Sequence, residues 1–207
     1  MPIRVIAPPA PLLVPSDVPG DHAADDPAVE AMIAAATALI DGPTGWLGRC
    51  FGPQTLEFSV ADWCGIEKLP YGPVIDVEAI SYINAGGAEV FLDDADWTRH
   101  GDYLYFATTF GRPATVKQAY PIKIQYEAGY NDGELSSGGT GPVPVQVEQA
   151  IIEGVQQLIL ARSETLGLRS VETVGVETIT YLDADKVSGI MRKAASGLVF
   201  GLWEPVV

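Results

Sequence analysis

The hydrophobic period of the sequence changes twice, and both changes restrict the fold. Residues 26–40 follow the period of a helix, and from Gln54 to Tyr130 the period becomes two. This alternation stops at Gly129, a turn rich in glycine and serine follows, and a second helix-periodic run begins behind Pro144. One predicted helix therefore precedes the alternating segment, and another follows it. The pattern predicts an α+β fold in which a β-rich insertion interrupts a helical core.

The first helix carries clear signals at both ends. Asp26 suits the N-cap, Pro27 suits the first helical position, and Gly42-Pro43 ends the run. Ala34–Ala36 leaves a flat surface that permits close approach by another helix. The second helix is expected over residues 144–163. The residues expected to pack these two helices are Val29, Met32, Ile33, Ala36, Ile40, Val147, Ile151, Val155 and Leu158.

The alternating segment predicts a small antiparallel unit of about five short strands. A hairpin turn is expected at residues 85–87, and a flexible loop at residues 131–141, where the sequence is rich in glycine and serine. The expected strands are Thr55–Val60, Val74–Ile83, Glu89–Leu92, Tyr103–Phe106 and Ile122–Tyr126.

The remaining segments complete the predicted organisation. Residues 170–181 suit an extended segment or a hairpin arm, and a third helix is expected from a cap near Asp183 to a stop near Gly197. A proline-rich arm, residues 1–24, is expected to be extended and to form neither a helix nor a central strand. We therefore predict one domain over residues 25–197, with its helical core of about three helices in 25–45 and 142–197, its β-rich insertion in 53–130 and its loop in 131–141.

The charge balance excludes some classes of partner. The chain has 27 acidic and 12 basic residues and a formal charge of −15. This balance argues against a basic footprint for nucleic acid and against attraction to an anionic membrane. Solubility explains the acidity as well as a functional role does. No apolar run is long enough to span a bilayer, and the start of the chain lacks the pattern of a secretory signal.

The sequence offers little for catalysis or for cofactors. It contains no nucleophile elbow, no phosphate-binding loop and no dinucleotide fingerprint. His22 and His100 are the only histidines, and Asp93–Asp96 lacks the other ligands of a calcium loop. With so many acidic residues, a pair of carboxylates for acid–base catalysis stays an open alternative, but no motif places two of them together. We expect no enzymatic activity, no cofactor and no bound metal.

The two cysteines favour a reducing compartment. Cys50 and Cys64 form neither a disulfide framework nor a complete zinc site. Reduced, structural thiols in a cytoplasmic protein are the favoured interpretation, and a bridge between the two is the alternative.

The last ten residues, 198–207, form an almost uncharged tail. An exposed tail of this composition would create an apolar patch, which usually marks an interface. The alternative is that the tail folds back on its own core. The residues expected to bind a partner are Phe200, Leu202, Trp203, Val206 and Val207.

An ordered set of motifs over residues 25–195 resembles the head–tail connector (adaptor) proteins of long-tailed bacteriophages and gene-transfer-agent particles. The set comprises the first helix with Thr44-Gly45, then Pro53–Glu57, Tyr126–Tyr130, Val143-Pro144 with Gln149–Ile151, and Ser170–Gly175 with Thr180-Tyr181. Each motif is weak alone, and their order gives the resemblance its specificity.

The resemblance implies a homo-oligomeric ring, commonly of about twelve copies, beneath the portal protein in the neck of a particle that assembles in the bacterial cytoplasm. A terminal tail would bind the portal, and a stopper or tail protein would bind the other side. DNA would pass through the ring without specific binding. Acidic residues around the channel would repel phosphate, which would let DNA slide.

Two alternatives remain. The chain suits another neck component, such as a stopper or tail-completion protein. It also suits a module whose β unit binds a glycan or a protein. The aromatic residues that make this second alternative conceivable are Trp97, Tyr103, Tyr105, Tyr120, Tyr126 and Tyr130.

Overall fold

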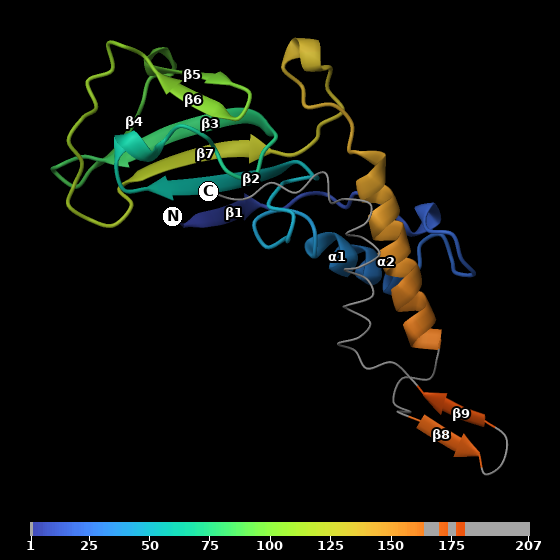
Figure 1. The fold of residues 1–207 in the computed structure, drawn as a ribbon. Coiled ribbons are helices and arrows are strands. Elements are labelled where there is room, and N and C mark those ends of the chain that lie inside the picture. The colour runs from blue at the N-terminus through green and yellow to red at the C-terminus, as the bar shows by residue number, and fades with distance from the viewer. Residues whose placement is uncertain (1, 164–169, 174–176, 181–207) are drawn as a thin grey trace. The chain divides into compact units, whose positions relative to one another are not determined.

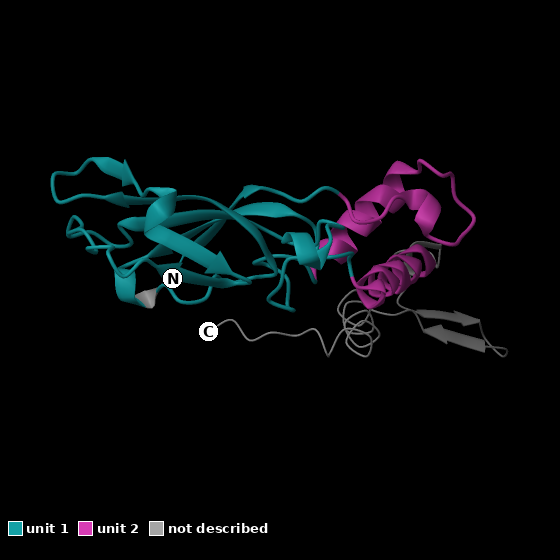
Figure 2. Ribbon diagram, turned by 90° about the horizontal axis from the view of Figure 1, so that it is seen from above, with its two compact units in different colours: residues 1–10, 40–143, 204–207 teal, residues 11–39, 144–203 magenta. Residues whose placement is uncertain are grey.

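The computed structural model describes residues 2–163, 170–173 and 177–180. These residues divide into two compact units, coloured separately in Figure 2. The sheet unit holds residues 2–10 and 40–143. The helical unit holds residues 11–39 and 144–163 together with a short ribbon. Between residues 2 and 163 the chain passes from one unit to the other after Ala10, after Leu39 and after Val143.

The sheet unit is built on a five-stranded antiparallel sheet (Figure 1). Its central strands, β2 and β7, pair over their full lengths, with Leu56 opposite Tyr126 and Phe58 opposite Ile124. In spatial order the strands are β1 (Ile3–Ala7), β2 (Gln54–Val60), β7 (Ile122–Ala128), β3 (Val74–Ile83) and β4 (Glu89–Phe91).

The two faces of this sheet differ as the alternating sequence requires. One face is buried and forms the core, to which β2 contributes Leu56, Phe58 and Val60. The other face is polar and half-buried, and on it Glu57 forms ion pairs with Arg4 at 3.3 Å and with Lys123 at 4.0 Å.

A second, two-stranded ribbon adds to the same core. It pairs β5 (Trp97–His100) with β6 (Tyr103–Phe106) and contributes the buried Leu104. The Trp63 ring lies edge-on to the rings of Tyr82, Phe106 and Phe110, with centroids 5.1 to 5.7 Å apart. Such edge-to-face pairs stabilise a core beyond the area that they bury.

The helical unit pairs α1 (Pro27–Ala38) with α2 (Val145–Ser163). The Asp26 side chain caps α1 as predicted, because it accepts a 2.8 Å hydrogen bond from the amide of Ala28. The segment before α1 contributes the buried Leu13 and Val18 to this unit. A ribbon of β8 (Ser170–Thr173) and β9 (Glu177–Thr180) follows α2, in agreement with the hairpin alternative for this segment.

The predicted fold class is wrong. The described residues contain two α-helices, a five-stranded antiparallel sheet and two ribbons, and so they are mainly β rather than built on a core of three helices. The physical reason is that the β strands bury the larger apolar core, whereas α1 has only 12 residues. The predicted third helix and the predicted tail lie outside the described residues.

The structure places parts of the proline-rich arm in both units. Residues Ile3–Ala7 are extended, as expected, and they form an edge strand that pairs with β2, so they belong to the sheet. Residues 11–24 pack in the helical unit. The five predicted strands are all present, and β5 is an additional strand that the sequence did not predict.

Candidate functional site

The predicted helix-packing residues divide between the two units. Val147, Ile151 and Val155 of α2 are buried, as are Val29, Ile33 and Ala36 of α1. Met32 and Leu158 are half-buried. Ile40 is also buried, but it belongs to the sheet unit. The predicted tail residues, Phe200 to Val207, lie outside the described residues.

The outer face of α1 is unusual because alanine dominates it and charged residues are scarce. Glu30 is the only charged residue among the 12 of the helix. A surface helix ordinarily places charged and polar side chains opposite its buried face, and a helix that is apolar all round is ordinarily buried all round. Its exposed alanines are Ala31, Ala34, Ala35 and Ala38, and Glu30 is exposed beside them in the first turn. Alanines let another helix approach closely and lose no side-chain entropy on burial.

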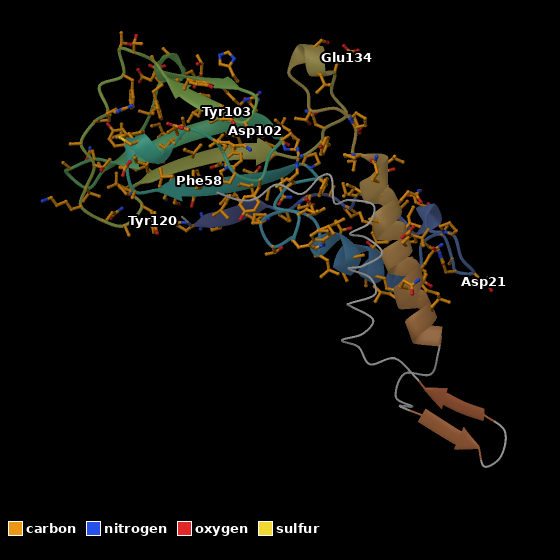
Figure 3. The ribbon with its side chains drawn as sticks, viewed as in Figure 1. Asp21, Phe58, Asp102, Tyr103, Tyr120 and Glu134 are labelled. Carbon is orange, nitrogen blue, oxygen red and sulfur yellow. The ribbon has the colours of Figure 1, made fainter. Side chains whose placement is uncertain are left out.

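The helical unit carries a net negative charge because basic residues are scarce in it. Its ranges 11–39 and 144–163 contain one basic residue, Arg162. The acidic residues in the same ranges are Asp17, Asp21, Asp25, Asp26, Glu30, Glu148 and Glu153. Asp21 lies on the loop before α1 (Figure 3). A surface of this sign repels phosphate and attracts cationic partners.

Asp41 is a buried carboxylate near the start of the longer range of the sheet unit, residues 40–143. The Oδ1 atom of Asp41 accepts hydrogen bonds from the amide of Phe51 at 2.6 Å and from the side chain of Gln54 at 3.3 Å. Its Oδ2 atom is buried without a hydrogen-bond partner. Burial raises the pKa of Asp41, and the surrounding amides, that of Phe51 first, partly offset the rise. Sequence analysis missed Asp41, since a single aspartate before Gly42-Pro43 also suits an ordinary turn.

The end of β7 meets the same region. The amide of Gly129 donates to the carbonyl of Pro73 at 2.8 Å, and the amide of Tyr130 donates to that of Phe51 at 3.0 Å. The ring of Tyr130 also stacks on the ring of Phe51. Gly129 has a φ of 133°, and a Cβ there would lie 2.5 Å from the carbonyl oxygen of Gly52. The motif Tyr126–Tyr130 therefore joins three chain segments at one place.

The aromatic residues of the β unit do not gather into one ligand platform. Tyr126 is buried, Trp97 packs against the core, and Tyr130 stacks on Phe51. The exposed members are Tyr103, Tyr105 and Tyr120. Figure 3 shows Tyr103 and Tyr120 well apart. This arrangement weakens the glycan-binding alternative.

The remaining candidate ligands are dispersed. Cys50 is buried, Cys64 is exposed, and both are free thiols rather than a bridge. The ring nitrogens of His22 lie 2.9 Å from the carbonyl of Val18 and 3.1 Å from that of Ala23. Within the described ranges, no three His, Cys, Asp or Glu residues are grouped to hold a metal ion. No described helix is long and apolar enough to cross a bilayer.

Comparisons with known proteins give structural matches alone. No family model and no curated protein matches the sequence. A chain in the virion of a native gene transfer agent (GTA) particle is 17% identical, with a TM-score of 0.60 over 100% of this chain and 97% of that chain. A chain in the neck of an empty GTA particle, computed with C6 symmetry, matches at 17% identity and a TM-score of 0.61, with the same coverage.

A third match comes from the neck of a native GTA particle computed with C12 symmetry. It is 17% identical, with a TM-score of 0.52 over 94% of each chain. At this level of identity the three matches show a shared fold.

Proposed function

We propose that this chain is a structural protein of the neck of a tailed-phage-like particle, and specifically a head–tail adaptor that forms a ring beneath the portal. The observation that carries the proposal is the fold shared along the whole chain with chains of GTA particles and their necks. The C6 and C12 symmetries of those neck structures are consistent with a ring. Around such a ring the chain surrounds the DNA exit channel and has no catalytic activity.

The alanine-rich outer face of α1 supports assembly into a ring. A closed ring requires two different surfaces of each copy to meet. Ala31, Ala34, Ala35 and Ala38 form a face that water solvates poorly and that a helix of the neighbouring copy can approach closely. We assign this face to the contact between copies.

The charge distribution supports a channel that DNA traverses without binding. The acidic helical unit repels phosphate, so DNA moves past it without sticking. The apolar tail, residues 198–207, is assigned to the portal, and a stopper or tail protein binds the opposite side.

Size measurement tests the proposal directly. Native mass spectrometry of the purified protein, alone and mixed with its particle's purified portal, is expected to detect a ring and a ring–portal complex. Removal of residues 198–207 is expected to abolish the complex and to preserve the ring. A chain that never forms a ring, and whose shortened form still binds the portal, contradicts the adaptor role. Binding to the tail-side protein without binding to the portal favours a stopper.

A further inference from the structure

The segment Asn131–Gly141, here called the finger, is held in one conformation by hydrogen bonds. Asn131 and Thr140 close its base. The Thr140 hydroxyl donates to the carbonyl of Gly129 at 2.8 Å and accepts from the amide of Asn131 at 3.1 Å. The Asn131 Oδ1 atom in turn accepts from the amides of Gly133 and Thr140 at 3.1 and 3.0 Å. The sequence predicted a flexible loop here, and these bonds were not foreseen.

Glycines bring the two sides of the finger into contact. A Cβ atom on Gly139 would clash with the carbonyl carbon of Gly133. Gly138 and Gly141 have φ values of 84° and 79°, which other residues rarely adopt. Two backbone hydrogen bonds complete the closure, from the Asp132 amide to the carbonyl of Gly141 and from the Gly141 amide to the carbonyl of Gly133, both at 3.0 Å. A finger fixed in this way loses less conformational entropy when it binds a partner.

The tip of the finger carries an apolar side chain that the fold does not use. Leu135 begins the short 3-10 turn η4 (Leu135–Ser137) and is 77% exposed, the largest value among the exposed large apolar side chains of the described residues. The neighbouring Glu134 marks the far end of the finger in Figure 3. A single exposed leucine is ordinary on a protein surface. A leucine at the tip of a loop that four side-chain hydrogen bonds hold at its base is not explained by the stability of the core.

Charge identifies the kind of partner. The finger carries Asp132 and Glu134, and the sequence contains no lysine or arginine between Lys123 and Arg162. A carboxylate beside an apolar tip, on a finger that has no basic residue, fits an apolar pocket bordered by lysine or arginine. Nucleic acid is excluded by the sign of the charge. A second copy of this chain, with a net charge of −15, is a poor electrostatic match.

We propose that the finger is a preformed plug that inserts Leu135 into a basic-rimmed apolar pocket of a neighbouring neck protein other than this chain. The proposal rests on the proposed function and adds to it a second contact, separate from the contact between copies and from the tail. Burial of a leucine side chain strengthens binding about ten- to hundredfold.

The test measures binding of the full-length protein to two probes, the purified portal ring and the purified tail-side neck protein of the same particle. Leu135→Ser is expected to weaken binding to one probe about ten- to hundredfold while the ring still forms. Phe91→Ser is the matched control, since Phe91 is 65% exposed in the same unit and is expected to leave both affinities unchanged.

Two further variants distinguish the loss of the plug contact from a defect in folding. Asn131→Ala opens the base of the finger and is expected to weaken the same binding without lowering the melting temperature of the sheet core. Glu134→Lys is expected to weaken binding to the same probe and to make this binding less dependent on salt.

If Leu135→Ser binds each probe as tightly as the wild-type protein does, the plug proposal is overturned and the adaptor role still stands. Loss of the ring itself in Leu135→Ser also overturns the plug, because Leu135 would then contact a second copy. Failure of the wild-type protein to bind either probe overturns both proposals.

Discussion

The hydroxyl group of Tyr126 donates a 2.7 Å hydrogen bond to the backbone carbonyl of Pro70 from within the core of the sheet unit. Tyr126 lies on the central strand β7, whereas Pro70 lies in the connection that leads to β3. The side chain thus ties a connection to the middle of the sheet. It also satisfies a hydroxyl group that would otherwise be buried at a cost.

Replacement of Tyr126 by phenylalanine removes this bond and leaves the carbonyl of Pro70 without its donor. We expect a loss of about 1–2 kcal/mol in the free energy of unfolding. Urea denaturation followed by fluorescence measures it. Tyr120→Phe, at an exposed position, is the control and is expected to change stability little. Equal stability of the two variants would contradict the role of the bond.

Asp41 should make stability depend on pH in a defined direction. Burial raises its pKa above the ordinary 3.8, so the folded state holds this proton more tightly than the unfolded state. The contribution of the protonated Asp41 carboxyl group to the free energy of unfolding is fully present below pH 3.8, and it is lost as the pH rises through the pKa of the folded state. Wild-type protein should therefore lose stability relative to Asp41→Asn between acidic and neutral pH. Unfolding by urea across this range measures the difference, with the exposed Asp94→Asn as control. A difference that stays constant with pH would refute the assignment.

Gly129 is expected to tolerate no side chain. Alanine there would meet the carbonyl oxygen of Gly52 and would have to adopt a φ of 133°. We expect Gly129→Ala to lower the free energy of unfolding by about 2–4 kcal/mol. Gly111→Ala is the matched control, since nothing lies within 4 Å of a Cβ atom at Gly111. Thermal unfolding of both variants provides the comparison, and similar melting temperatures would argue against the close approach.

The two cysteines should differ in reactivity. Burial raises the pKa of the Cys50 thiol and shields it from reagents, whereas Cys64 is exposed. Native protein treated with a maleimide should gain one label, on Cys64, and unfolded protein should gain two. Mass spectrometry of the intact and digested protein reads the result. Rapid labelling of Cys50 in native protein would show that the sheet core opens readily.

A charge added among the exposed alanines of α1 should block assembly without unfolding the chain. Ala35→Glu adds a carboxylate to an exposed helical position, where the cost to the isolated chain is a few tenths of a kcal/mol. We expect monomers in place of rings in sedimentation experiments. Ala114→Glu, also exposed but in a loop of the sheet unit, should still form rings. Rings formed by Ala35→Glu would place the contact elsewhere.

Local signals explain what the sequence predicted well. The cap at Asp26, Pro27 behind it and the helical period that follows act within a few residues, so α1 was found at its true start. Five of the six strands between Gln54 and Tyr130 were predicted for a similar reason, since alternation is read within each strand, and β5 was missed.

Non-local contacts explain what the sequence did not predict. β1 is only five residues long and is surrounded by prolines, and it becomes a strand because β2, some fifty residues away, supplies its hydrogen bonds. The same holds for the finger, where Asn131 and Thr140 order each other across the loop. Asp41 likewise acquires its role from Phe51 and Gln54. Residue type alone identifies none of these pairings.

The position of β1 has a consequence for how this protein can evolve and be dissected. Ile3–Ala7 precedes α1 in the sequence, whereas the other strands of its sheet follow α1. Neither unit is therefore encoded by one continuous stretch of the gene. Recombination that exchanges residues 40–143 alone would deliver β2 with an unpaired edge, which invites aggregation. The two units should therefore be inherited together, and functional chimaeras should require exchange of the amino-terminal strand along with the rest of the sheet.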